Sequence, residues 1–239
     1  MRDAAAILLA AGSGSRMQGL VEDKILALIG DRPVFDYSLT AFARAGIVGR
    51  LVVVYRDPAQ RKQLAAIFAQ SDARHLPARW VRGGTERQHS VSRALAALPA
   101  SVDWVFIHDC ARPLVRTDDL AAVDRAMRRD GAACLAHPVT DTIKRVTARR
   151  TKPVRSRLRT VDRSRLWAME TPQAFSRPLI VDAYAEVDRR ELRITDDTSA
   201  LELVTRHPVT LVTSTGPDLK ITRPADLAYA GFLVQRSQT

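Results

Sequence analysis

Apolar residues follow two alternating patterns along the chain, short continuous runs and stretches with helical spacing. Such runs are typical of strands buried on both faces of a sheet. The helical stretches carry proline or acidic residues in their first turns, and the first of them stops at Gly46. Strands are predicted over Ala5–Ala10, Leu51–Tyr55, Trp80–Val81, Val102–His108, Ala132–Ala136 and Val209–Val212. Helices are predicted over Val34–Ala45, Pro58–Phe68, Arg87–Ala97, Thr117–Arg129, Pro178–Val187 and Arg223–Val234, with a short helix that begins at Thr195 as its N-cap.

This alternation predicts an α/β fold with a mixed, mostly parallel central sheet flanked by helices. We expect residues 1–239 to form a single domain. Residues 140–166 differ, because their apolar residues are separated by arginine and threonine, and they predict a protruding β-arm within that domain. Ligands of such sheets bind beyond the carboxyl ends of the strands. That rule selects four segments, Gly12–Arg16, Gly83–Arg87, Asp109–Arg112 and Asp141–Arg145.

Composition narrows the class of protein. Of the 239 residues, 46% are hydrophobic and 26% charged, which is a globular balance and excludes a disordered chain. No apolar run approaches the ~18 residues of a membrane span. The apolar N-terminus is interpreted as a buried first strand rather than a signal peptide, and the two cysteines as free thiols of a cytoplasmic protein. The net charge of +11 favours an anionic partner, although arginines scattered over a surface would give the same charge.

The first glycine loop follows directly after the first predicted strand. Gly12 and Gly14 allow the backbone to approach an anion closely, so that successive N–H groups can hold a phosphate. The loop matches neither the dinucleotide fingerprint nor the P-loop, so it is also compatible with a simple turn. Arg16 and Lys24 would supply the cations that a triphosphate needs.

Two further segments carry candidate chemistry. Asp109 ends a buried strand and could hold a divalent metal, or it could cap its loop by pairing with Arg112. Asp141–Arg145 places two cations beside a hydroxyl, which suits a phosphate monoester but also a solvated turn. Lys220 precedes the last predicted helix, and the five histidines lack the spacing of a zinc site.

Taken together and in this order, the segments are much more specific than any one of them. The chain resembles the family of 2-C-methyl-D-erythritol 4-phosphate cytidylyltransferases over almost its whole length. The matching segments are Ala10–Met17, Lys24, Gly83–Ser90, His108–Pro113, Asp141–Arg145, Arg163–Trp167, Thr171–Phe175, Thr195–Glu202 and Leu219–Leu227.

The resemblance implies a Rossmann-like nucleotidyltransferase fold and a Mg²⁺-dependent enzyme that transfers CMP from CTP to a sugar-alcohol phosphate. It also implies a homodimer in which the arm embraces the second subunit. By the same resemblance, the catalytic cations are Arg16, Lys24 and Lys220. The residues implied to bind the nucleotide are Ala10, Ala11, Gly12, Gly14, Gly84, Arg87, Ser90, Asp109 and Cys110, with Asp109 also placed at the metal. Those implied to bind the sugar phosphate are Arg112, Thr142, Lys144, Arg163, Thr171 and Thr195.

The chain departs from the family pattern in several places. Glu22–Ile25 stands where Pro-Lys-Gln is usual, and Met169 and Glu170 replace the usual pair before Thr171. Three alternatives to this function stay open: a sister enzyme that uses ribitol 5-phosphate, an inactive nucleotide-binding relative, or, because of the net positive charge, a nucleic-acid-binding protein. We disfavour nucleic acid, because aromatic residues make up only 5% and the basic residues are spread along the chain.

Overall fold

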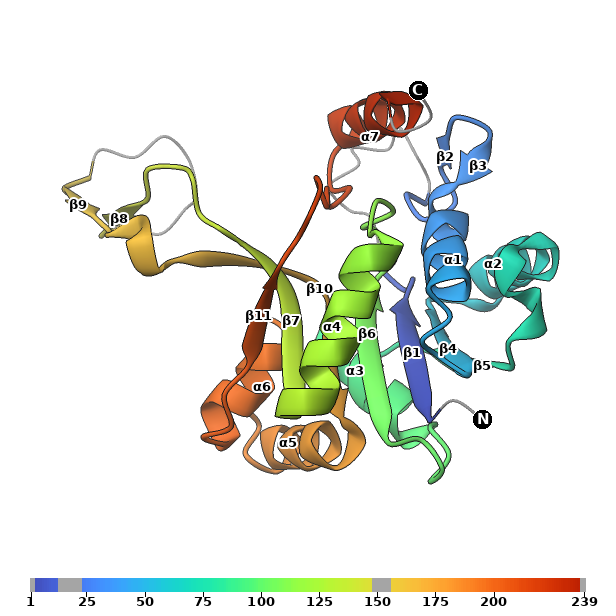
Figure 1. The fold of residues 1–239 in the computed structure, drawn as a ribbon, viewed down its shortest axis with the longest axis horizontal. Coiled ribbons are helices and arrows are strands. Elements are labelled where there is room, and N and C mark those ends of the chain that lie inside the picture. Colours follow the sequence, from blue (N-terminus) through green and yellow to red (C-terminus); the bar gives the residue numbers. More distant parts are fainter. Residues whose placement is uncertain (1–2, 13–22, 148–155, 237–239) are drawn as a thin grey trace.

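The computed structural model describes residues 3–12, 23–147 and 156–236, and its centre is a seven-stranded sheet (Figure 1). The strand order is β11-β7-β10-β6-β1-β4-β5. Neighbouring strands are parallel except where β10 pairs antiparallel with both β6 and β7. This confirms the predicted mixed, mostly parallel sheet. The strands are β1 (Ala4–Leu9), β4 (Arg50–Tyr55), β5 (Ala78–Arg82), β6 (Trp104–Asp109), β7 (Ala132–Pro138), β10 (Trp167–Ser176) and β11 (Thr210–Thr213).

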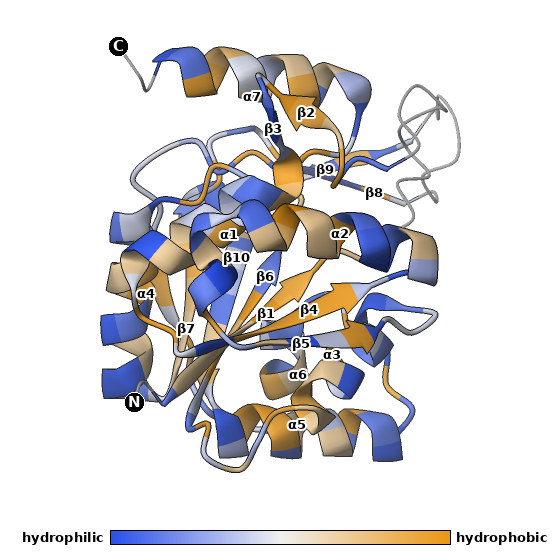
Figure 2. Ribbon diagram, turned by 90° about the vertical axis from the view of Figure 1, so that its right-hand side faces the viewer, coloured by the Kyte–Doolittle hydropathy of each residue, from blue (hydrophilic) through white to orange (hydrophobic). Residues whose placement is uncertain are grey.

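Helices cover both faces of the sheet (Figure 2). Along β1, Ala4, Ala6 and Leu8 belong to the core shared with α1 and α4, whereas Ala5 and Ile7 belong to the core shared with α3 and α5. Because successive strand residues point to opposite faces, burial on both faces requires the continuous apolar run seen in the sequence. The helices are α1 (Val34–Ala45), α2 (Pro58–Gln70), α3 (Arg87–Ala96), α4 (Thr117–Asp130), α5 (Arg177–Arg189), α6 (Asp197–Val204) and α7 (Pro224–Arg236).

Helix ends follow their local chemistry. Gly46, with φ 61°, ends α1 in the left-handed conformation that glycine adopts at least cost, as the sequence predicted. The predicted N-cap of α6 is wrong by one residue. Asp196, not Thr195, is the cap, and its carboxylate accepts the N–H of Ser199 at 3.0 Å. Aspartate and threonine both cap helices, so the two adjacent residues could not be separated from sequence alone.

The largest difference from the predicted elements is β10. No strand was predicted over Thr171-Pro172-Gln173, but these residues lie inside a strand in the middle of the sheet. Proline lacks the N–H that a strand interior needs. The pairing of β10 with β7 shifts register between Met169 and Gln173, so Pro172 falls where the hydrogen-bond ladder is interrupted.

The predicted arm leaves the sheet between β7 and β10 and projects away from it (Figure 1). Within it, β8 (Lys144–Val146) pairs antiparallel with β9 (Leu158–Thr160), as expected of a hairpin; residues 148–155, which join them, lie outside the described residues. A smaller hairpin of β2 (Leu28–Ile29) and β3 (Arg32–Pro33) lies beside α7. None of the helices that the structure describes has the length and hydropathy to cross a membrane.

Candidate active site

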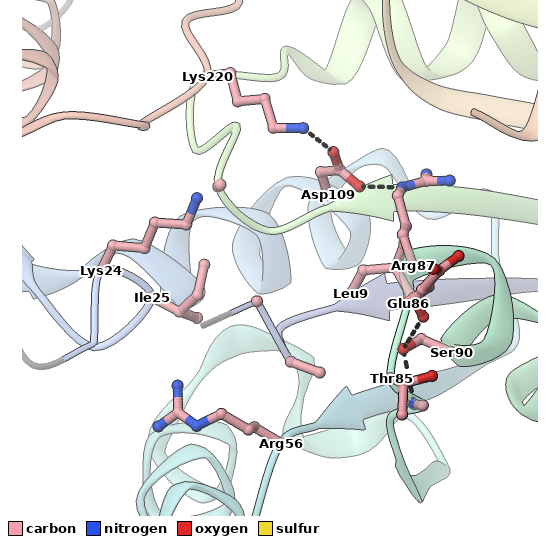
Figure 3. A pocket seen from close by; sticks show the side chains of 14 residues that line it. Leu9, Lys24, Ile25, Arg56, Thr85, Glu86, Arg87, Ser90, Asp109 and Lys220 are labelled. Carbon is pink, nitrogen blue, oxygen red and sulfur yellow. Dashed lines mark hydrogen bonds and ion pairs between the residues drawn. The ribbon is translucent and has the colours of Figure 1, made fainter. Parts of the chain in front are cut away.

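A pocket of about 410 Å³ opens at the carboxyl ends of β1, β4 and β6 (Figure 3). Its position is the one that the strand-end rule predicts for a ligand. It brings together residues from six segments of the sequence. The predicted site residues that line it are Ala11, Gly12, Lys24, Gly84, Arg87, Ser90, Asp109 and Lys220.

Asp109 is the last residue of β6, and both of its carboxylate oxygens accept hydrogen bonds from cations (Figure 3). Arg87 Nε donates to Oδ1 at 3.1 Å, and Lys220 Nζ donates to Oδ2 at 2.5 Å. Burial by itself raises the pKa of Asp109, but the charges of Arg87 and Lys220 outweigh it and hold this pKa well below its usual range. Asp109 is therefore a carboxylate at every physiological pH.

Arg87 is in turn held by Asp197, which is fully buried. Its Nη1 and Nη2 donate to the two oxygens of Asp197 at 2.9 and 2.7 Å. Burial by itself lowers the pKa of Arg87, but Asp197 and Asp109 raise it well above its usual value. With Lys220, these residues form a set of two carboxylates and two cations whose charges balance.

Lys24 lies on the side of the pocket opposite Arg87 (Figure 3). Its Nζ donates to the carbonyl of Ile221 at 2.9 Å. The neighbouring Asp23 fixes the turn, because its Oδ1 accepts the N–H of Ile25 and its Oδ2 accepts from Gln60. Although the sequence around Lys24 departs from the family pattern, the hydrogen bonds of Asp23 hold this turn in place.

The Gly83-Gly84 turn forms another side of the pocket. A Cβ on Gly84 would lie 2.4 Å from Cβ of His89, and one on Gly83 would lie 2.7 Å from Cβ of Ala11. Both positions therefore require glycine. Ser90 Oγ accepts the N–H of Gly84 at 3.0 Å, so this predicted nucleotide-binding side chain also shapes the turn.

Thr171 supports Asp109 from behind. Its Oγ1 accepts the backbone N–H of Asp109 at 3.1 Å and lies 3.1 Å from Nδ1 of His108. Burial lowers the pKa of His108 to about 4, so its ring is neutral. Its Nε2 lies 3.2 Å from the carbonyl of Arg112 and 3.3 Å from Oγ of Ser38. The hydroxyl of Thr171 thus orients the Asp109 backbone, and its contact with a sugar phosphate stays a prediction.

Arg112 does not pair with Asp109, so that alternative for the loop is wrong. Its Nη1 donates to the backbone carbonyl of Asp218 at 2.6 Å and to the carboxylate of Asp218 at 3.2 Å, and its Nη2 donates to the carbonyl of Met169. Arg112 thus joins the end of β6 to the segment that carries Lys220.

Other predicted residues lie away from the pocket. In the arm, Lys144 bonds Thr160, and Arg163 bonds the carbonyl of Thr140. None of Thr142, Lys144, Arg163 and Thr195 lines the pocket. Ala10 and Cys110 are buried, and burial raises the pKa of the Cys110 thiol. Gly14 and Arg16 lie outside the described residues.

Arg56 and Asp197 were not among the predicted site residues. Arg56 lines the pocket directly after β4, and the strand-end rule would have found it had β4 been included. Asp197 has no such signal, because its sequence context is that of an ordinary acidic first turn of a helix.

The described residues include no cluster of three or more histidine, cysteine, aspartate or glutamate side chains that could hold a metal ion. The pocket nevertheless offers the carboxylate of Asp109. Among the described residues, each of its oxygens accepts one hydrogen bond and retains a further lone pair. Magnesium is commonly held by one or two carboxylates together with substrate phosphates, so these residues fit an ion that arrives with a phosphorylated ligand.

Comparisons with known proteins identify the family of the chain. The family model described as 2-C-methyl-D-erythritol 4-phosphate cytidylyltransferase matches residues 4–236. A protein of that name from Synechococcus sp. is 37% identical over 231 residues, covering 96% of this chain and 99% of the relative. Another, from Klebsiella pneumoniae, is 38% identical over 237 residues, covering 98% of this chain and 94% of the relative.

Solved structures give the same result. The 4-diphosphocytidyl-2C-methyl-D-erythritol synthase of Anaerococcus prevotii superimposes with a TM-score of 0.82 at 26% identity, covering 98% of each chain. The 2-C-methyl-D-erythritol 4-phosphate cytidylyltransferase of Thermus thermophilus superimposes with a TM-score of 0.75 at 29% identity, covering 96% of this chain and 98% of that one.

Proposed function

This chain belongs to the 2-C-methyl-D-erythritol 4-phosphate cytidylyltransferase family, and from that premise we propose that it transfers CMP from CTP to 2-C-methyl-D-erythritol 4-phosphate. The products are 4-diphosphocytidyl-2-C-methyl-D-erythritol and pyrophosphate, in the non-mevalonate route to isoprenoids. The observation that carries the proposal is the pocket in which Lys24, Arg87, Asp109 and Lys220 meet at the carboxyl edge of the sheet.

The chemistry needs positioning and charge rather than a strong base. A phosphate oxygen of the acceptor attacks the α-phosphorus of CTP, the bond from that phosphorus to the β-phosphate bridge breaks, and pyrophosphate leaves with the electron pair. The acceptor phosphate is already an anion at neutral pH. Lys24 and Lys220 would neutralise the charge on the reacting phosphates, and Arg56 adds a third cation to the pocket.

We assign a single protein ligand to Mg²⁺. Asp109 would hold the ion together with oxygens of the triphosphate. When bound, the ion would neutralise charge on the phosphates. Arg87 and Lys220 would keep the Asp109 carboxylate ionised and oriented toward the pocket whether or not CTP is present.

We also propose a cytoplasmic homodimer whose arms supply part of the acceptor site. Arg163 does not line the pocket of its own chain. The arm exposes the apolar side chain of Leu158, and Trp167, directly after the arm, is exposed as well. In such a dimer, the pocket of one subunit and the arm of its partner form one site. Mixing the two inactive variants Arg163→Ala and Lys220→Met should then restore activity, because one mixed site contains both intact residues. A mixture with no more activity than its separate components would place Arg163 in its own subunit.

The function is tested by measuring pyrophosphate release from CTP and Mg²⁺ with either of two acceptors. We expect a strong preference for 2-C-methyl-D-erythritol 4-phosphate over D-ribitol 5-phosphate, and no release without an acceptor. The opposite preference would reassign the acceptor and leave the chemistry unchanged. Stabilisation by CTP without release from either acceptor would identify an inactive relative.

A further inference from the structure

Asp197 is the first residue of α6, and its carboxylate binds Arg87, which lines the pocket. Its side chain is 0% exposed. Besides Arg87, it accepts the hydroxyl of Tyr184 from α5, with 2.6 Å from Oη to Oδ1. Its backbone N–H donates to Oε1 of Gln173 in β10 at 2.9 Å. Side chains from α3 and α5 therefore hold this carboxylate, and β10 holds the backbone N–H of the same residue.

A buried ion pair of this kind is weak evidence for a role in stability. Desolvation of the two charges offsets most of their attraction, and well-packed apolar residues often serve a fold equally well. Such a pair does, however, fix the orientation of the guanidinium. Two parallel N–H···O bonds fix the plane of a guanidinium, which a single bond would leave free to turn.

The orientation of the guanidinium determines where the Nε–H of Arg87 points. With Nη1 and Nη2 committed to Asp197, Nε–H is aimed at Oδ1 of Asp109. The bond fixes one oxygen of that carboxylate and presents the other to Lys220. Asp197 is thus connected to a reactive lysine through two side chains, although it does not line the pocket.

We propose that Asp197, braced by Tyr184, is a positioning residue for CMP transfer: it aims Arg87 at Asp109 and thereby sets the position of Lys220. The proposal rests on the proposed function for its kinetic consequences. The alternative is that Asp197 only joins α6 to α3, in which case substitution would change stability and leave the folded enzyme unaltered.

The kinetic test compares Asp197→Asn with a matched control, Asp188→Asn. Both remove one carboxylate next to α3, but Asp188 is exposed, and among the described residues its carboxylate bonds only Ser92 Oγ, at 3.0 Å. An asparagine at 197 would direct its own amide against the guanidinium or lose one of the two bonds. We expect Asp197→Asn to lower kcat/KM for CTP about tenfold or more and the control to stay within about twofold. Kinetics of the folded Asp197→Asn enzyme within twofold of wild type would overturn the proposal.

Coupling to Arg87 provides the second test. If Asp197 acts by aiming Arg87, then adding Asp197→Asn to an Arg87→Gln background should change kcat/KM by less than about twofold. Fully additive losses would mean that Asp197 acts independently of Arg87. Tyr184→Phe, which removes a single hydrogen bond, gives a milder variant should Asp197→Asn fold poorly; we expect a loss of about threefold from it, again absent in the Arg87→Gln background.

A third readout does not depend on turnover. In ¹H–¹⁵N spectra of arginine side chains, the Nε–H of Arg87 should give a resonance protected from exchange, assigned by its disappearance in Arg87→Lys. Asp197→Asn should broaden or shift that resonance and Asp188→Asn should not. An unchanged resonance in Asp197→Asn would refute the positioning role while leaving the proposed function intact. The expected change in a protein that releases no pyrophosphate would refute the proposed function alone.

Discussion

Two buried carboxylates stand close to Lys220 and behave in opposite ways. Asp109 accepts a hydrogen bond from Lys220, and Asp218 precedes Lys220 by two residues in the chain. Burial by itself raises the pKa of both. The pKa of Asp109 nevertheless lies well below its usual range, whereas that of Asp218 is raised to about 7.

The difference lies in the charges around each group. Asp109 has a cation on each oxygen. Asp218 has Arg112 on one oxygen, while Glu170 and Asp119 add negative charge nearby. Within the described residues, Oδ1 of Asp218 has no hydrogen-bond partner. The salt bridge to Arg112 would favour the ionised form, but burial outweighs it, and we expect Asp218 to titrate near neutral pH.

The comparison teaches that burial alone does not decide the charge of a carboxylate. The number of cations and donors aimed at it does. Around Asp109 the charges balance, so the group stays ionised and can act on a phosphorylated ligand. Around Asp218 negative charge is in excess. Ionisation of this carboxyl therefore destabilises the segment that carries Lys220.

Removing Lys220 should have the largest effect, because it breaks the balanced cluster. Lys220→Met takes one of two cations from Asp109 and one positive charge from the pocket. We expect kcat to fall about 100-fold or more, the usual loss for a group that stabilises developing charge. Steady-state pyrophosphate release measures this loss, and Lys62→Met, at an exposed position of α2, is the control. A loss below tenfold would show that the balance around Asp109 is not needed for turnover.

Lys24 tests whether a cation outside that cluster matters as much. It bonds the carbonyl of Ile221 across the pocket from Arg87. Lys24→Ala should lower turnover by more than about tenfold, but less than Lys220→Met does. The same assay compares the two variants directly. Near wild-type activity would mean that another residue of this segment neutralises the phosphates.

Asp218→Asn should raise the stability of the protein, whereas the two lysine variants lower its activity. The folded-state pKa of about 7 exceeds the ordinary value of 3.8, so the protonated carboxyl is favoured on folding. Its contribution to stability is fully present below about pH 4 and is lost as the pH rises through 7. Asparagine does not titrate. We therefore expect the variant to gain at least about 1 kcal/mol over wild type at pH 8, since each unit of pKa shift corresponds to about 1.4 kcal/mol, and nothing near pH 4.

Urea unfolding of wild type and Asp218→Asn across that range measures this difference. A matched variant, Asp124→Asn, removes a partly buried carboxylate that is paired with Arg128 on α4. It should show no gain at pH 8. If Asp218→Asn were destabilising at pH 8, the bond to Arg112 would outweigh the excess negative charge.

Glu170→Gln should give the smallest effect. It removes the charge that contributes to raising the pKa of Asp218, while its contact with His137, 2.8 Å in the parent, can persist as a neutral hydrogen bond. We expect a gain of about 0.5 kcal/mol at pH 8 and a downward shift of the pH at which stability declines. The same unfolding series detects both. An unchanged pH dependence would show that Glu170 does not act on Asp218.

Much of the fold could be predicted because the signals for it are local. The bounds of α1 follow from apolar spacing between Pro33 and Gly46, and β1 follows from a run that must be apolar on both faces. The strand-end rule also located most of the pocket without any knowledge of distances. By contrast, β10 was missed, because its proline and polar residues become compatible with a central strand only at the register shift against β7.

By itself, the sequence determined the α/β class, the family and the glycine turns, and it selected Lys24, Asp109 and Lys220 as candidate site residues. These depend on periodicity, backbone freedom and chain order, which the sequence contains directly. The charge pairing was decided only by the tertiary structure. Asp109 pairs with Arg87 and Lys220 rather than with the nearby Arg112, and Arg87 is aimed by Asp197, 110 positions away. The physical reason is that the energy of a buried charge depends on the distances and desolvation that packing creates, and neither is a property of sequence separation.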